Sequence, residues 1–221
     1  IGIEAFNCES LQEIYVINEM AHVHGLKANV SVRINPDIDA HTHKYVTTGL
    51  YENKFGISQH EFDKLIDILK KSEHINFIGL HFHIGSQITR VEEVFALECQ
   101  RVNDIVAYFE RNGLKVNNIN LGGGLGVDYD DPDENAIPDF ETWFRTISEN
   151  IARRDDQAVH VEPGRSLVAQ CATLISRVLF VKSGETKNFL IMDAGMNDLI
   201  RPALYGAYHK IENLSASQRQ F

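Results

Sequence analysis

The chain has 221 residues, 43% of them hydrophobic, which is enough for one large domain or one domain with part of another. Its 31 acidic and 21 basic residues leave a net charge of −10, which argues against nucleic-acid binding through a broad basic surface. No apolar stretch approaches the roughly 20 residues that span a bilayer, and residues 1–8 lack the basic start of a signal peptide. Three widely spaced cysteines predict neither a disulfide framework nor a metal site. We therefore expect a cytoplasmic protein with a small-molecule partner, and no nucleic-acid or membrane partner.

Strands and helices alternate along the first third of the chain. Residues 1–6 predict a strand, and a capping box at Ser10 and Glu13 opens a helix that Gly25 ends. Apolar and polar side chains alternate over residues 30–34, which predicts a strand, and a second capping box at Ser58 and Glu61 opens the next helix. Because the pattern starts abruptly and without Met, we expect the chain to be a piece of a longer one.

The same unit continues through the middle of the chain. We predict strands over 77–84, 116–121 and 159–162 and helices over 92–112 and 140–151. About five strands are fewer than the eight of a closed barrel, so residues 1–165 predict a partial (β/α)8 TIM barrel whose front is missing. Beyond Arg165 the pattern changes to strands without helices, over 172–181 and 189–192. Residues 166–221 therefore predict the beginning of a C-terminal β-domain.

Three glycine-bearing segments each follow a predicted strand. They are His83-Ile84-Gly85-Ser86, Gly122-Gly123-Gly124 and Glu162-Pro163-Gly164-Arg165. His83 and Gly122 are 39 residues apart, and Gly122 and Glu162 are 40 apart, so the segments would meet at the mouth of a βα barrel. Glycine lets backbone N–H groups approach a phosphate closely, and Ser86 and Arg165 add donors. The pattern predicts a site for a phosphorylated ligand.

Each motif also has a purely structural interpretation. His81 and His83 share one side of the pleat, and a histidine on a strand is usually a hydrogen-bonded structural residue. We interpret His81 in this way. We interpret His83 as functional, because a Gly-Ser turn follows it. The glycine triplet is also compatible with a flexible loop, and Pro163-Gly164 with an ordinary turn. Arg201 offers a carboxylate clamp and Tyr205 a phenol, although by spacing alone both are equally compatible with a solvated surface.

Four strings resemble those of the diaminopimelate branch of the fold-type III pyridoxal-phosphate (PLP) decarboxylases. They are 83–87 (HIGSQ), 120–126 (NLGGGLG), 162–166 (EPGRS) and 201–209 (RPALYGAYH). The first three are shared, in variants, with ornithine and arginine decarboxylases. The fourth is particular to the diaminopimelate branch, as is Arg33-Ile34-Asn35-Pro36 followed by Thr42-His43, Thr48-Gly49 and Lys54-Phe55-Gly56.

The resemblance implies an alanine-racemase-type barrel followed by a β-domain, and a homodimer with active sites at its interface. It implies PLP as the cofactor, an amino acid as the substrate, and the conversion of meso-2,6-diaminopimelate to L-lysine and CO2 in lysine biosynthesis. Two alternatives stay open: an ornithine- or arginine-type PLP decarboxylase, disfavoured by Arg201 and Tyr205, and a non-catalytic PLP-binding relative that regulates a partner.

The resemblance also implies roles for individual residues. His83 and Glu162 would be catalytic: His83 would stack on the cofactor ring, and Glu162 would pair with the pyridinium nitrogen, which keeps the ring a strong electron sink. The side chain of Arg165, with Arg201 and Tyr205, would bind the distal carboxylate of the substrate. The phosphate would be held by Ser86, Gly122, Gly123, Gly124, Pro163, Gly164 and the backbone of Arg165.

The chain also departs from the resembled family. The family has a lysine at the end of the first barrel strand that bonds covalently to PLP, and a cysteine motif and a tyrosine in the β-domain, none of which has a counterpart here. Lys27-Ala28-Asn29 mimics the lysine motif but precedes the strand that leads to Arg33, so we interpret Lys27 as a surface loop residue. We therefore expect the 221-residue chain alone to be inactive.

Overall fold

The computed structural model describes residues 2–38, 54–135 and 137–215. The motif residues Thr42-His43 and Thr48-Gly49 lie outside these ranges. The chain divides into two compact units, Ile1–Gly126 with Ile137–Leu167 and Val127–Ala136 with Val168–Phe221, and each is described by itself. Within the described ranges, no helix has the length and the apolar character needed to cross a membrane.

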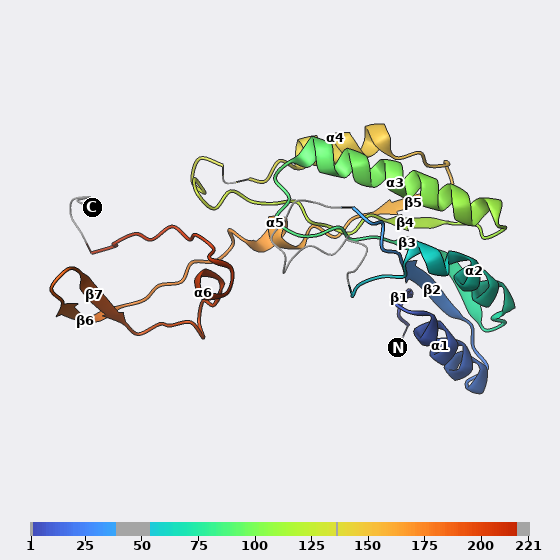
Figure 1. Ribbon diagram of the computed structural model, residues 1–221, viewed down its shortest axis with the longest axis horizontal. Coiled ribbons are helices and arrows are strands. Elements are labelled where there is room, and N and C mark those ends of the chain that lie inside the picture. Colours follow the sequence, from blue (N-terminus) through green and yellow to red (C-terminus); the bar gives the residue numbers. More distant parts are fainter. Residues whose placement is uncertain (1, 39–53, 136, 216–221) are drawn as a thin grey trace. The chain divides into compact units, whose positions relative to one another are not determined.

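The first unit is built on a five-stranded parallel sheet whose strand order follows the chain (Figure 1). Its strands are β1 (Phe6–Cys8), β2 (Ala28–Arg33), β3 (Ile75–His81), β4 (Asn118–Asn120) and β5 (Ala158–His160). Every neighbouring pair is parallel, which requires a crossover connection between consecutive strands. All five carboxyl ends therefore meet at one edge of the sheet, as in the wall of a βα barrel.

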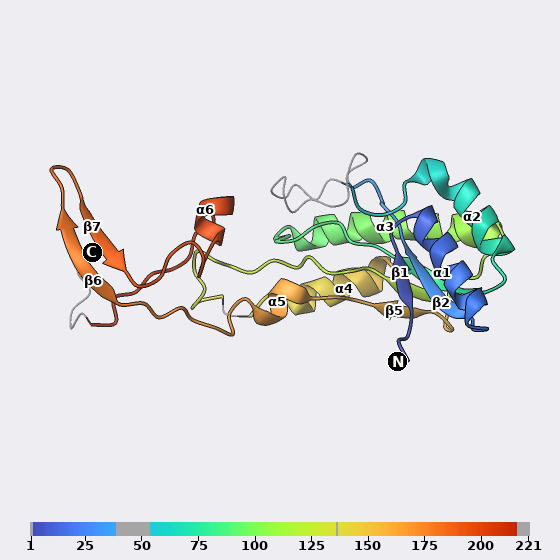
Figure 2. The same ribbon diagram turned by 90° about the horizontal axis from the view of Figure 1, so that it is seen from below.

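Helices fill the connections between these strands. They are α1 (Leu11–Val23), α2 (Phe62–Lys71), α3 (Val91–Arg111) and α4 (Phe140–Asn150), with the short α5 (Gly164–Val168) after β5. Helices α3 and α4 pack side by side in both views (Figures 1 and 2). The predicted alternation of strands and helices is confirmed, with boundaries that differ by a few residues.

The two predicted capping boxes have different outcomes. At α1 the box forms: the Glu13 N–H donates to Ser10 Oγ at 3.3 Å, and the Ser10 N–H donates to the Glu13 carboxylate at 3.0 Å. The prediction of a capping box at Ser58 and Glu61 was wrong, because the Ser58 side chain makes no capping hydrogen bond. The chain enters this helix through a 3₁₀ turn, η1 (Gln59–Glu61), so α2 itself begins only at Phe62.

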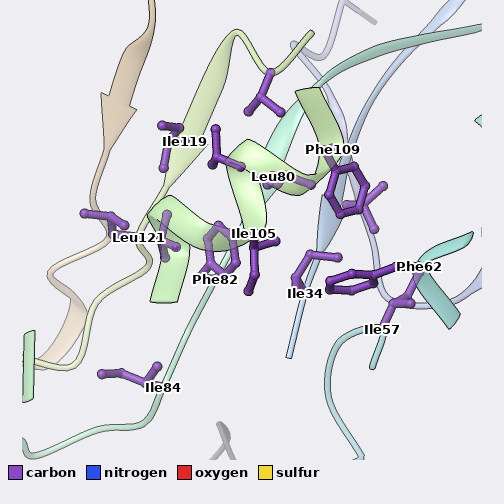
Figure 3. Close-up of a cluster of buried hydrophobic side chains, with 14 of the residues drawn as sticks. Ile34, Ile57, Phe62, Leu80, Phe82, Ile84, Ile105, Phe109, Ile119 and Leu121 are labelled. Carbon is purple, nitrogen blue, oxygen red and sulfur yellow. The ribbon is translucent and has the colours of Figure 1, made fainter. Parts of the chain in front are cut away.

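Alternating apolar residues anchor β3 in the core. Leu80, Phe82 and Ile84 are all fully buried, and Figure 3 shows them with Ile105 and Phe109 of α3. Because side chains alternate across a strand, His81 and His83 point to the opposite face. The apolar face of β3 thus supports the fold, and its polar face is left for the site.

The second unit contains an antiparallel pair, β6 (Val178–Ser183) and β7 (Asn188–Met192). β6 begins later than the predicted residue 172. The prediction of strands without helices was wrong here, since α6 (Arg201–Tyr205) lies beyond β7. Pro202 is tolerated in the first turn of this helix, and Gly206 ends it in the left-handed conformation with φ of 61°.

Candidate cofactor site

The loops that follow β3, β4 and β5 are tied together by backbone hydrogen bonds. The N–H of Phe82 donates to the carbonyl of Asn120 at 2.7 Å, and the N–H of Leu121 donates to that of His160 at 3.0 Å. The N–H of Glu162 then donates to the carbonyl of Gly122 at 2.6 Å. The three predicted strand-end motifs therefore lie side by side in the first unit.

The glycine triplet is required by this close packing. A Cβ on Gly123 would lie 1.9 Å from the carbonyl oxygen of Glu162, and one on Gly122 would lie 2.3 Å from that of Phe82. Gly122 and Gly124 also have positive φ angles, 67° and 116°, that other residues rarely adopt. The interpretation of the glycine triplet as a merely flexible loop was wrong, because backbone atoms of the neighbouring loops lie against each of the three glycines. Gly164 differs, since apart from its chain neighbours and the backbone of its own helix no atom lies within 4 Å of the position its Cβ would take.

The imidazole of His83 is held by this loop. Its Nδ1 accepts a hydrogen bond from the N–H of Gly123 at 3.3 Å, which leaves the proton on Nε2. Burial lowers the pKa of His83, and the positive charge of Arg33 lowers it further. The ring is therefore neutral and fixed in one orientation.

Glu162 faces two side chains to which our sequence analysis assigned no role in the site. One oxygen of its half-exposed carboxylate accepts from the amide Nδ2 of Asn120 at 2.8 Å and lies 3.6 Å from Nε2 of His81. The imidazole of His81 is buried, and neither of its nitrogens has a hydrogen-bond partner among the described residues. Our interpretation of His81 as a hydrogen-bonded structural residue was therefore wrong. Two features of the sequence indicated that His81 and Asn120 lie near Glu162. His81 shares a pleat face with His83, and Asn120 stands two residues before the glycine triplet.

The charge state of His81 follows from its surroundings. Burial lowers its pKa and is the largest cause, while the negative charge of Glu162 acts in the opposite direction. Beyond His81, Arg33 at the end of β2 forms an ion pair with Glu9 at the end of β1. Glu9 also accepts the N–H of Gly56 at 2.9 Å, so both of its carboxylate oxygens are engaged. The charges of both residues act on His81, since Arg33 lowers its pKa and Glu9 raises it.

The predicted phosphate ligands lie on the same loops. Arg165 donates to the side-chain oxygen of Gln87 at 3.3 Å, which joins the third motif to the turn after Ser86. The N–H of Gly122 is already bonded to Oδ1 of Asn120 at 2.8 Å, and that of Gly123 is bonded to His83. An anion in this arrangement would therefore depend on Ser86, Gly124 and the open side of Gly164 rather than on the first two N–H groups of the triplet.

The predicted substrate residues Arg201 and Tyr205 lie in the second unit, on α6. The guanidinium carbon of Arg201 lies 4.5 Å from the ring centroid of Tyr129, and Nη1 is 3.4 Å from Nε2 of His209. Burial and the charge of Arg201 both lower the pKa of His209. Arg165 belongs to the first unit, so a clamp made jointly by Arg165, Arg201 and Tyr205 stays a prediction.

Lys27 is exposed in the loop before β2, as predicted. Arg33, which is ion-paired with Glu9, lies at the other end of β2. A residue at the amino end of a barrel strand lies far from the mouth where the strand-end motifs meet. The resemblance of Lys27-Ala28-Asn29 to a lysine motif is therefore local only.

The chain belongs to the pyridoxal-dependent decarboxylases, since the pyridoxal-binding domain of that family matches residues 1–169. Diaminopimelate decarboxylase of Bacteroides thetaiotaomicron is 51% identical over 217 residues, which are 98% of this chain and 56% of that protein. The enzyme of the same name from Neisseria meningitidis serogroup A is 42% identical over 211 residues, 96% of this chain and 51% of that protein. The chain thus spans about half the length of the curated relatives it matches.

Solved structures give the same assignment. A point mutant of Helicobacter pylori diaminopimelate decarboxylase, complexed with L-lysine, has a TM-score of 0.88 and 38% identity and covers 98% of this chain and 53% of its own. The diaminopimelate decarboxylase of M. jannaschii, also complexed with L-lysine, has a TM-score of 0.79 and 36% identity. The match covers 94% of this chain and 49% of that one. The fold is confirmed as part of an alanine-racemase-type barrel.

PLP is the cofactor of this family, and the described residues fit it. A phosphate needs donors and open space: the Ser86 hydroxyl is a donor, and Gly164, whose own N–H is bonded to the carbonyl of Glu162 at 2.7 Å, leaves open space. A pyridine nitrogen needs a carboxylate, which Glu162 supplies with half of its surface exposed. A neutral, fixed imidazole such as that of His83 suits the face of an aromatic ring.

Proposed function

We propose that the intact protein decarboxylates meso-2,6-diaminopimelate to L-lysine and CO2. The observation that carries this proposal is the 51% identity, over 98% of the chain, to a protein named diaminopimelate decarboxylase. The complexes of two structural relatives with L-lysine, the product of this reaction, add support. Neither an ornithine- or arginine-type activity nor a regulatory role has a comparable observation in its favour.

When bound, PLP supplies an electron sink for the electron pair left behind as CO2 departs. In this proposal Glu162 keeps the proton on the ring nitrogen, and the carboxylate is already held by Asn120 for that task. His83 packs against the ring, since its imidazole is held by the N–H of Gly123. Both residues would act by orientation and charge.

The phosphate would be bound by the loops after β3, β4 and β5. Ser86 would donate from its hydroxyl, and Gly164 would admit the phosphate on its open side. Gly124, Pro163 and the backbone of Arg165 would complete the phosphate-binding loops. This assignment is supported by the contacts that tie the three loops together.

The side chain of Arg165, with Arg201 and Tyr205, would bind the distal carboxylate of the substrate. A guanidinium forms two parallel hydrogen bonds with a carboxylate, whereas ornithine would present an ammonium that arginines repel. Arg201 and Tyr205 are four positions apart on α6, which places them on the same side of that helix. The substrate class is thus proposed from charge complementarity.

We further propose that residues 1–165 form the cofactor-binding barrel domain and that residues 166–221 begin the β-domain. The intact protein would be a homodimer with active sites at its interface, working in the cytoplasm. The resemblance to the diaminopimelate branch supports both statements. Light scattering after size-exclusion chromatography would measure the dimer.

The test is a substrate comparison with the purified intact protein. With PLP present, meso-2,6-diaminopimelate should give L-lysine and CO2 in equal amounts, and ornithine and arginine should be turned over at least about 100-fold less efficiently. Equal turnover of ornithine or arginine would contradict the substrate assignment. PLP binding without any turnover would favour the regulatory alternative.

A further inference from the structure

We propose that Asn120 is a positioning residue that orients the Glu162 carboxylate toward the cofactor ring. The proposal rests on the proposed function, in which Glu162 acts on the ring nitrogen of PLP. Asn120 stands directly before the loop 121–124, and its side chain reaches Glu162, 42 residues further along the chain.

Both halves of the Asn120 amide are engaged. Its Oδ1 accepts from the N–H of Gly122 at 2.8 Å, and its Nδ2 donates to Oε1 of Glu162 at 2.8 Å. The first bond fixes the orientation of the amide, because the oxygen must point to the N–H and the nitrogen must then point away. The amide is therefore aimed at the carboxylate by the loop itself.

The backbone of Glu162 is tied to the same loop. Its N–H donates to the carbonyl of Gly122 at 2.6 Å, so Glu162 is held by Gly122 at its main chain and by Asn120 at its side chain. Without such contacts, a half-exposed glutamate would sample several rotamers, and holding it in one geometry would cost side-chain entropy. Asn120 thus couples the position of the glycine loop to that of the carboxylate.

A neutral donor is needed at this position. The nearby imidazole of His81 lies at 3.6 Å, beyond normal hydrogen-bond distance, and Arg33 is engaged by Glu9. An aspartate in place of Asn120 would keep the acceptor for Gly122 but would bring a second carboxylate against Glu162. Two carboxylates in contact cannot both stay ionised without repulsion, so the pair would separate or share a proton.

Asn103 offers a matched control. Its Nδ2 donates to the carbonyl of Asn150 at 2.9 Å and its Oδ1 accepts from the N–H of Ala152 at 2.8 Å, so it too bridges two segments with both halves of its amide. These partners are backbone groups on α4 and the following loop. Asn103→Asp therefore reports the structural cost of the same substitution without a facing carboxylate.

The experiment compares Asn120→Asp, Asn120→Ser and Asn103→Asp in the intact, PLP-loaded protein. Serine retains an oxygen for the Gly122 N–H but lacks an amide that reaches Glu162. Both Asn120 variants should retain PLP and lower kcat by roughly 10-fold to 100-fold with KM changed less than about threefold. With ring-¹⁵N-labelled PLP, the nitrogen resonance should shift toward the unprotonated position in the Asn120 variants and stay unchanged in Asn103→Asp.

The outcomes separate this inference from the function on which it rests. Absence of PLP binding or of diaminopimelate turnover in the unmodified protein would overturn the proposed function and this inference with it. An active unmodified protein would overturn the inference alone if Asn120→Ser kept the normal kcat and nitrogen resonance. An equal loss of activity in Asn103→Asp would also overturn it, because the effect would then be structural.

Discussion

Glu162 is positioned by residues at the ends of two other strands. Asn120 of β4 donates to its carboxylate, and Nε2 of His81 of β3 lies 3.6 Å from the same oxygen, so its geometry depends on β3 and β4 as much as on β5. A glutamate placed in this way can hold a proton on a ring nitrogen with little reorganisation. The charge of this carboxylate should therefore matter more for the chemistry than for cofactor retention.

Glu162→Gln should keep the acceptor for Asn120 but lose the negative charge. We expect kcat of the intact protein to fall by about 100-fold or more while PLP stays bound, because only the electron-sink function is weakened. Steady-state kinetics and the visible absorption of bound PLP measure the two effects. Glu93→Gln is the control, since Glu93 forms an exposed ion pair with Arg90. Unchanged turnover in Glu162→Gln would show that the carboxylate has no part in the chemistry.

Glu98 is a buried carboxyl group on the core-facing side of α3. It is fully buried, and neither carboxylate oxygen has a hydrogen-bond partner among the described residues. Burial raises the pKa of Glu98 well above its usual range. The folded state therefore keeps the proton at pH values at which the unfolded chain has released it, so stability is lost as the pH rises through the folded-state pKa.

Glu98→Gln should remove this pH-dependent loss, because the amide has the shape of the protonated acid and does not ionise. We expect the free energy of unfolding to rise on the order of 1 to 3 kcal/mol at pH 8, and the gain to shrink toward pH 4.5. Urea unfolding of the intact protein at both pH values measures it. A gain of the same size at both would show that ionisation of Glu98 is not the cause.

Among the connecting loops, the one after β4 lies at the centre of the candidate site. It contacts the loop after β3 on one side and the loop after β5 on the other, and it has glycine at each point of close approach. Backbone-to-backbone contact of this kind transmits any displacement directly to His83 and Glu162. A substitution that disturbs the packing of this loop should therefore also weaken cofactor binding.

Gly123→Ala tests this coupling, because its Cβ would lie 1.9 Å from the carbonyl oxygen of Glu162. We expect a loss of about 1 to 3 kcal/mol in the free energy of unfolding, and at least about 10-fold weaker PLP binding. Gly164→Ala is the control for folding, since open space surrounds that position. Its stability should change by less than about 0.5 kcal/mol. Equal stability of the two variants would contradict the packing argument.

The predicted site residues are divided between the two units of the chain. The first unit contains the residues proposed to bind the cofactor, and the second contains Arg201 and Tyr205. Arg201 is placed by Tyr129 and His209 within its own unit. Cofactor binding and substrate choice should therefore be separable by mutation.

Arg201→Ala should lower kcat/KM for diaminopimelate by roughly 30-fold to 1,000-fold, because a charge-assisted contact to the distal carboxylate is lost. PLP affinity should stay within about threefold of normal, since Arg201 lies outside the cofactor-binding unit. Arg145→Ala is the control, as Arg145 forms an exposed ion pair with Glu92 at 2.7 Å. Unaltered kinetics in Arg201→Ala would contradict the proposed substrate contact.

Sequence alone determined the βα alternation, the apolar face of β3 and the strand-end positions of the three glycine motifs. These features are local, because the periods of a strand and a helix are visible within a few consecutive residues. The first capping box and the stop at Gly25 after α1 are local for the same reason, and the structure confirms them. The family resemblance also followed from short strings.

Which side chains meet depends on contacts between distant parts of the chain. The hydrogen bond from Asn120 to Glu162 joins residues 42 apart, and the ion pair of Arg33 with Glu9 joins residues 24 apart. No periodicity encodes such pairs, because they depend on the register of neighbouring strands. The same holds for the glycine triplet, whose members are glycine because the backbones of two other loops occupy the space where side chains would lie.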